Sequence, residues 1–381
     1  MQAFVNAQVL AGEDFQSGLA VIVADGRIVD LLADTDPRLE RVQKHDLGGD
    51  YLVPGFIDAQ VNGGGGVLFN DAPYVDTIRR IGAAHSQFGT TGFLPTLISD
   101  DRCVMRSAIS AVGAAIAARV PGVLGIHLEG PYLAPERRGI HDAAKFQIPN
   151  ADDVELLATP TRGKTLVTLA PERVPETVIR ELRSRGVLVA AGHTAADYAQ
   201  TVRSLAAGVR GFTHLFNAMT PLQSREPGAV GAALEDRDSW CGVIVDGQHV
   251  HPAALRIAVL TKPRGKVFLV TDAMPPVGSG ETQFTLNGET ISCRDGRLVN
   301  AQGTLAGSNL DMASAVRNAK AQLQISLAEA VRMASTYPAA FLGLDTTHGR
   351  IAKDCAADLV VLGESLQVRE TWIGGARVFV S

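Results

Sequence analysis

Short apolar runs alternate with longer amphipathic runs through the middle of the chain. Apolar runs of strand length lie at Leu52–Val61, Gly92–Ile98, Val123–Glu129, Thr165–Ala170, Val187–His193, Gly211–Phe216, Gly242–Val245 and Val267–Asp272. Segments with helical periodicity lie at 74–88, 101–118, 175–185, 195–207, 252–260 and 326–342. Strands that alternate with helices are typical of folds with a parallel sheet.

Two parallel folds fit this alternation: a (β/α)8 barrel and an open, doubly wound sheet. Polar residues end nearly every predicted strand. An open sheet collects its ligand-binding residues at one switch point, whereas all strand ends of a barrel face the same mouth. The pattern therefore favours the barrel.

The two ends of the chain have a different, all-β pattern. Asp25-Gly26 separates two apolar runs near the N-terminus, which is a strong hairpin signal, and short strands recur after residue 357. Neither end has enough core to fold alone. We therefore expect residues 1–52 and 349–381 to form one small β-sandwich domain, and residues 53–348 to form the barrel.

One stretch interrupts the alternation after the eighth predicted strand. Residues at about 275–308 show no helical pattern, and turns are predicted at Asn287-Gly288 and Asp295-Gly296. We expect a β insertion on the mouth side of the barrel. It is either a wall of the site or an ornament, and the sequence leaves both interpretations open.

Composition excludes several classes of protein. The 381 residues are 46% hydrophobic and carry a formal net charge of −5, which argues against general binding to nucleic acid or anionic membranes. The four cysteines are scattered without a Cys-x-x-Cys pair, so neither a zinc ribbon nor a disulfide framework is indicated. No signal peptide or membrane span is apparent, so a cytoplasmic protein is expected.

Glu129, His193 and His214 each end a different predicted strand. A single histidine at such a position is more often a satisfied polar residue than a ligand. One carboxylate and two imidazoles meeting at one rim, however, match a catalytic zinc site with an open fourth position. His127 faces the same way as Glu129. It is a candidate for a fourth ligand, but we favour a role in which it supports the metal site without binding the ion.

Asp272 ends the last predicted strand. A carboxylate beside a metal can take a proton from water and later give it to a leaving amine, although a ligand or helix-capping role is the alternative. Gln60 and Asn62 stand where metal hydrolases of this architecture commonly carry His-x-His. Because amides are poor zinc ligands, they argue for one metal ion rather than two.

Weaker signals indicate an anion site and a carbonyl contact. Asn217 and Ala218 follow the third ligand, and Arg225 and His249 lie further along. Arginine, histidine and backbone amides suit a phosphate group, but an arginine in a loop is usually a solvated charge. His141 is a candidate for polarising a substrate carbonyl.

The motifs that carry these residues resemble the N-acetylglucosamine-6-phosphate deacetylase family of amidohydrolases. They are PGFIDAQVNGGGG (54–66), GIHLEGPYL (125–133), AGHTAA (191–196), THLFNAMTPLQSREPG (213–228), VDGQHVHP (245–252), VTDAMPPVG (270–278) and the tail GRIAKDCAADLVVL (349–362). Together they span most of the predicted barrel.

The resemblance implies an activity and a role for each candidate residue. It implies hydrolysis of the acetamide of N-acetyl-D-glucosamine 6-phosphate to D-glucosamine 6-phosphate and acetate, with one divalent ion per subunit, Zn²⁺ or another. The metal ligands would be Glu129, His193 and His214, the acid and base Asp272, and the sugar and carbonyl contact His141. The phosphate and sugar contacts would be Asn217, the backbone of Ala218, Arg225 and His249. In the family the arginine comes from the neighbouring subunit, which implies a homodimer.

Three other functions remain as alternatives. A related N-acetyl amino-sugar phosphate is one alternative substrate. A cyclic-amide hydrolase would be expected to keep His-x-His and often a bridging lysine, which Gln60, Asn62 and the run Thr168–Glu172 do not supply. An inactive scaffold would be expected to have lost a ligand or the acid.

Overall fold

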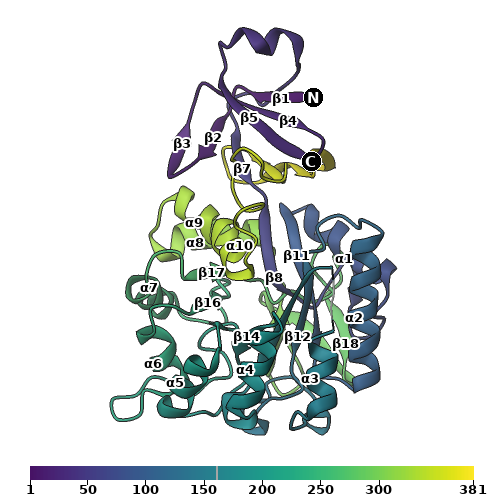
Figure 1. The fold of residues 1–381 in the computed structure, drawn as a ribbon, viewed down its shortest axis with the longest axis vertical. Helices are drawn as coiled ribbons and strands as arrows, with labels where there is room; N and C mark the ends of the chain where they lie inside the picture. Colours follow the sequence, from purple (N-terminus) through teal and green to yellow (C-terminus); the bar gives the residue numbers. More distant parts are fainter. Residues whose placement is uncertain (160–161) are drawn as a thin grey trace.

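The computed structural model describes residues 1–159 and 162–381. Its centre is a sheet of eight parallel strands in chain order, closed into a barrel (Figure 1). The strands are β8 (Phe56–Val61), β11 (Thr90–Ile98), β12 (Gly125–Glu129), β13 (Lys164–Leu169), β14 (Leu188–Ala191), β15 (Gly211–Phe212), β16 (Trp240–Val243) and β17 (Val267–Leu269). At the seam the backbone N–H of Asp272 donates to the carbonyl of Gln60 at 3.0 Å. The predicted (β/α)8 barrel is confirmed.

Helices surround this barrel (Figure 1). They are α1 (Val75–Ser86), α2 (Arg102–Ala117), α3 (Ala151–Leu157), α4 (Glu176–Ser184), α5 (Tyr198–Ala207), α6 (Gly228–Glu235), α7 (Pro252–Thr261), α8 (Met312–Leu323), α9 (Leu327–Ala334) and α10 (Thr336–Leu342). Short 3-10 turns lie at Pro37–Arg41, Pro135–Arg137, Ala143–Lys145 and Pro171–Arg173.

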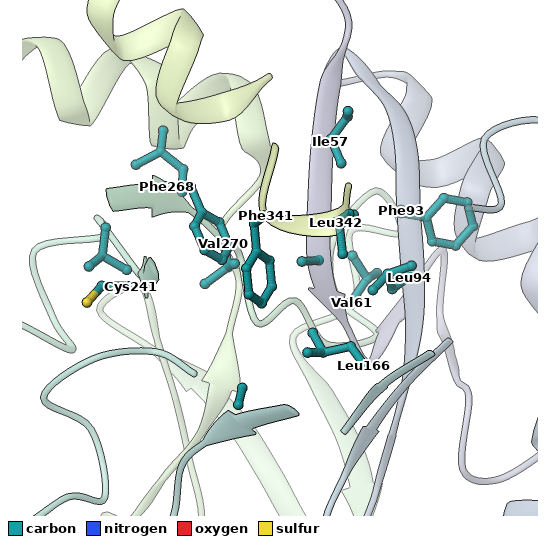
Figure 2. Packing of buried hydrophobic residues seen from close by; sticks show 14 of the residues in the cluster. Ile57, Val61, Phe93, Leu94, Leu166, Cys241, Phe268, Val270, Phe341 and Leu342 are labelled. Carbon is teal, nitrogen blue, oxygen red and sulfur yellow. The ribbon is translucent and has the colours of Figure 1, made fainter. Parts of the chain in front are cut away.

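Apolar side chains fill the barrel (Figure 2). Phe341 of α10 is almost fully buried and stacks on Phe268 of β17, with ring centroids 4.9 Å apart. Burying an aromatic ring of this size stabilises the fold by roughly 2–3 kcal/mol. A Cβ added at Gly211, where β15 begins, would lie 2.8 Å from the Phe341 ring, so α10 closes the barrel at the end opposite the strand carboxyl termini.

Strands from both ends of the chain form two further sheets that pack on each other. One sheet holds β5 (Arg27–Ala33), β4 (Leu19–Ala24), β1 (Gln2–Val5) and β6 (Gln43–Asp46). The other holds β24 (Ala376–Val380), β23 (Val368–Ile373), β22 (Leu359–Leu362), β7 (Tyr51–Pro54), β2 (Gln8–Ala11) and β3 (Asp14–Gln16). One hydrophobic cluster contains residues of both sheets, among them Phe4, Val9 and Trp372. The expected sandwich of N- and C-terminal strands is present, and the exact domain boundaries stay a prediction.

Two predicted elements are each split in two. The run Leu52–Val61 was expected as one strand, but β7 belongs to the sandwich and β8 to the barrel. Gly55 separates them, and a Cβ added there would lie 2.0 Å from the Thr91 hydroxyl oxygen. The expected helix 326–342 is α9 and α10, which are separated by Ser335 in a non-helical conformation (φ −135°).

The insertion after β17 is a four-stranded antiparallel sheet. Its strands are β18 (Gln283–Leu286), β19 (Glu289–Arg294), β20 (Arg297–Val299) and β21 (Leu305–Ser308). Asn287-Gly288 forms the first turn, and both residues have positive φ (52° and 79°). A further two-stranded ribbon pairs β9 (Gly63–Gly64) with β10 (Val67–Leu68).

Candidate metal centre

Three of the predicted site residues lie where a strand turns into a loop with left-handed backbone. His193, His214 and Asp272 have φ angles of 47°, 33° and 54°. Residues other than glycine rarely adopt this region, and each such conformation costs on the order of 1–3 kcal/mol. The surrounding packing must hold these residues in place, as is usual where side-chain direction matters for function.

The structure brings Glu129, His193 and His214 together. Nε2 of His214 lies 2.9 Å from Oε1 of Glu129 and 3.1 Å from Nε2 of His193, and the His193 nitrogen lies 3.3 Å from the same carboxylate oxygen. All three residues are buried. Tetrahedral Zn²⁺ with bonds of about 2.0–2.1 Å separates its ligand atoms by roughly 3.4 Å. The donor set therefore fits one small divalent ion.

The charges of these groups depend on one another. Burial alone would disfavour the Glu129 carboxylate, but hydrogen bonds from the two imidazoles outweigh it and hold its pKa well below the usual range. For His214, burial acts against the charge, and the Glu129 hydrogen bond reverses this and raises the pKa. A bound metal cation would likewise favour the ionised form of the Glu129 carboxylate.

A backbone carbonyl orients His193. Its Nδ1 lies 2.8 Å from the carbonyl oxygen of Arg137, so Nδ1 carries the proton and donates it. Nε2, which faces Glu129, is therefore the ring nitrogen that would bind a metal in place of its contact with the carboxylate. Carbonyls that fix the tautomer of a ligating imidazole in this way are a regular feature of metal sites.

Asp272 lies beside the cluster and is held by two amides. Its Oδ1 accepts hydrogen bonds from Gln60 Nε2 at 3.0 Å and from Asn62 Nδ2 at 2.7 Å. Gln60 Nε2 also lies 3.2 Å from both carboxylate oxygens of Glu129. Burial, followed by repulsion from Glu129, raises the pKa of Asp272 to about 6. A carboxyl group with this pKa can both accept and return a proton near neutral pH.

His141 lies against the His193 ring, with centroids 4.4 Å apart. Burial, then repulsion from His193, lowers its pKa to about 3, so the ring is neutral. The backbone N–H of Ser99 points at Nδ1 from 3.4 Å, and the Ser99 hydroxyl lies 2.9 Å from it. Nδ1 is therefore the acceptor, and Nε2–H is a donor suited to a carbonyl oxygen.

These residues border one cavity of about 470 Å³. Its lining includes Glu129, His141, His193, His214, Asn217, Ala218, His249, Asp272 and the insertion residues Gly303, Thr304, Leu305 and Gly307. The insertion thus forms a wall of the cavity. Asp246 Oδ2 lies 2.6 Å from His249 Nδ1 and orients that ring. Arg225 is exposed and lies outside this lining.

Some contacts differ from the sequence-based expectations. His127 bonds the hydroxyls of Thr96 and Thr168 at 3.2 and 2.7 Å, and among the described residues it makes no hydrogen bond to the three candidate ligands. Gln60 and Asn62 were interpreted only as missing ligands, yet they hold Asp272. Their spacing of two residues at a strand end, which places both side chains on one face, was the signal for this role.

Comparisons with known proteins show the family to which the chain belongs. The model of the amidohydrolase family matches residues 51–378, and the chain belongs to this family. The chain is 42% identical to the N-acetylgalactosamine-6-phosphate deacetylase of Shewanella sp. (strain ANA-3), over 98% of this chain and 95% of that protein. It is 39% identical to the human N-acetylglucosamine-6-phosphate deacetylase, over 88% and 85% of the two chains.

Solved structures show the same fold. The crystal structure of N-acetylglucosamine-6-phosphate deacetylase from Pasteurella multocida superposes with a TM-score of 0.95 at 34% identity, and the match covers 100% of both chains. A mutant of the Mycobacterium smegmatis N-acetyl-D-glucosamine-6-phosphate deacetylase, solved with N-acetyl-D-glucosamine-6-phosphate, matches with a TM-score of 0.91 at 32% identity, over 100% of this chain and 99% of that one. In the described residues, no helix is long and apolar enough to cross a membrane.

Proposed function

We propose that the protein hydrolyses the acetamide of N-acetyl-D-glucosamine 6-phosphate to D-glucosamine 6-phosphate and acetate. The observation that carries this proposal is the convergence of Glu129, His193 and His214 beside Asp272 in one cavity. The names of the Shewanella and human relatives above supply the substrate class, a phosphorylated N-acetyl amino sugar. The three ligands would hold one divalent ion, for which we propose Zn²⁺ because of its preference for nitrogen and carboxylate ligands.

When bound, the ion would polarise the carbonyl oxygen of the substrate and lower the pKa of the attacking water. Asp272 takes the proton of the attacking water while the amides of Gln60 and Asn62 hold its Oδ1. The new C–O bond forms at the acetyl carbon. The C–N bond then breaks, and Asp272 returns its proton to the leaving amine. Proton uptake and release by one carboxyl group balance over the cycle.

The remaining contacts orient the substrate. His141 would donate from Nε2–H to the acetyl oxygen, since Nδ1 is occupied by Ser99. Asn217, the backbone of Ala218 and His249 border the same cavity and would bind the sugar and its phosphate.

Arg225 requires a second subunit in this proposal. It lies on an exposed loop outside the cavity of its own chain, so we propose a homodimer in which it reaches the neighbouring site. Mixing inactive Arg225→Ala and Asp272→Asn subunits should restore activity, because each mixed dimer contains one site with both residues intact. No restoration in verified mixed dimers would contradict this arrangement.

A galactosamine substrate is the second candidate, since a 42% identical relative carries that name. The two sugars differ only at C4. Acetate release should be measured with both N-acetylhexosamine 6-phosphates and with both unphosphorylated sugars. We expect turnover of the glucosamine derivative and strong dependence on the phosphate. Turnover of the galactosamine derivative alone would favour the second candidate, and turnover of neither would overturn the proposal.

We further propose a cytoplasmic location. All four cysteines are free thiols in the structure, two of them buried. This state is typical of proteins that work in a reducing compartment.

A further inference from the structure

The loop 134–141 wraps around the candidate ligand His193. The backbone N–H of Ala134 donates to the His193 carbonyl at 2.9 Å, and the Arg137 carbonyl accepts from His193 Nδ1 at 2.8 Å. Gly139 approaches the ring so closely that an added Cβ would lie 3.2 Å from His193 Cε1. The same loop ends at His141. Two candidate site residues therefore depend on the position of this one loop.

The loop has little regular structure of its own beyond the 3-10 turn Pro135–Arg137. The loop is instead held in place by contacts with the insertion. Ile140 packs against the cluster that contains Leu286 and Leu298 of the insertion. Asn287, at the tip of the β18–β19 hairpin, donates from Nδ2 to the Ile140 carbonyl oxygen at 3.1 Å.

We propose that Asn287 is a positioning residue for the metal centre. By holding the Ile140 carbonyl, it fixes the loop that places the Arg137 carbonyl behind His193 and the His141 ring beside it. The insertion would then be a working part of the site rather than only its wall. The predicted effect on catalysis rests on the function proposed above, whereas the predicted effect on metal binding does not.

The turn itself permits a clean test. Asn287 has a φ of 52°, a conformation that asparagine, aspartate and glycine tolerate. Asn287→Asp keeps the turn but replaces the donor by a carboxylate that faces a carbonyl oxygen. Asn287→Gly removes the contact without adding charge. Asp295 occupies the same position in the β19–β20 turn (φ 50°), so Asp295→Asn is a matched control.

The experiment compares Zn²⁺ affinity of the metal-free full-length variants by competition with a chromophoric chelator. Loss of a partner one step behind a ligand weakens metal binding about 10- to 100-fold. Because Asn287 acts one step further back, we expect about a 3- to 10-fold loss for Asn287→Asp, a smaller loss for Asn287→Gly and none for Asp295→Asn. Thermal midpoints measured in parallel should match the wild type.

In the acetate-release assay, Asn287→Asp should lower kcat more than it raises KM, because the hydrogen bond from His141 to the acetyl oxygen strengthens as negative charge develops there in the transition state. Unchanged metal affinity in Asn287→Asp, or equal weakening in Asp295→Asn, would overturn the proposal. Should the protein fail to deacetylate either sugar phosphate, the metal titration would still decide the role of Asn287.

Discussion

Replacing Asp272 by asparagine separates catalysis from stability. The variant keeps the size of the side chain, and its amide oxygen can still accept from Gln60 and Asn62. It loses the ability to move a proton. A positioned general base contributes about 10²- to 10⁴-fold to rate, so we expect turnover to fall by that factor while metal content stays that of the wild type.

The same change should make the metal-free protein more stable near neutral pH. Burial, followed by Glu129, raises the pKa of Asp272 from 3.8 to about 6. A group whose pKa is raised on folding contributes stability below pH 4, and this contribution is lost as the pH rises through 6. About two pKa units correspond to roughly 3 kcal/mol. Asparagine does not titrate, so the variant should gain relative stability between pH 4 and 7.

Asp358 supplies a matched control far along the chain from the ligands. Burial likewise raises its pKa to about 6, and its Oδ1 accepts from the backbone of Gly374 at 2.8 Å. Asp358→Asn should therefore shift stability with pH in the same direction but leave turnover within about twofold of wild type.

The assays are acetate release with the metal-loaded enzyme, metal content per subunit, and denaturant unfolding of the metal-free protein at pH 4, 5.5 and 7. Turnover of Asp272→Asn within tenfold of wild type would refute the role of Asp272 as acid and base. An unchanged or lower relative stability at pH 7 would refute the reasoning about its buried charge.

Three further outcomes follow from the structure. The profile of kcat/KM should rise with pH and level off at or below pH 6, because the base must be ionised and a bound cation would lower the pKa of Asp272 from its raised value of about 6; a rise that continues above pH 7 would contradict this. Chelation should abolish acetate release, and one equivalent of Zn²⁺ should restore it; full activity after verified removal would refute a metal requirement. Lys262→Met should cost about 2–4 kcal/mol in unfolding free energy, since buried Lys262 donates to the carbonyls of Ala233 and Asp236 and to Ser239 Oγ; a loss below about 0.5 kcal/mol would count against it.

The barrel could be predicted from the sequence because the alternation of apolar strands and amphipathic helices repeats through the whole central part of the chain. Polar residues end nearly every predicted strand, and Glu129, His193 and His214 meet because strand ends of a barrel share one rim. Asp272 reaches the same place because the seam joins β17 to β8.

The helices α3, α6 and α8 were missed, and only α6 has a clear physical reason. Residues 228–234 of α6 are all buried, so this helix has no polar face to show periodicity. The break between β7 and β8 at Gly55 depends on close contact with Thr91, a residue distant in sequence. Contacts of this kind cannot be recognised from the local amino-acid sequence.

The supporting contacts of the site could not be predicted for a related reason. The carbonyl that accepts a hydrogen bond from His193 belongs to the backbone of Arg137. The identity of the Arg137 side chain therefore gives no information about this hydrogen bond. Ser99 beside His141 is an ordinary strand-end serine in the sequence. Only the three-dimensional path of the loops brings these partners into place.

Diffraction from crystals loaded with Zn²⁺, measured at the metal absorption edge, tests the central claim most directly. The anomalous signal should show one ion per subunit, bonded to Glu129, His193 and His214 at about 2.0–2.2 Å, with Asp272 within hydrogen-bonding distance of a water on that ion. An ion held by other residues, or Asp272 turned away from that water, would contradict it.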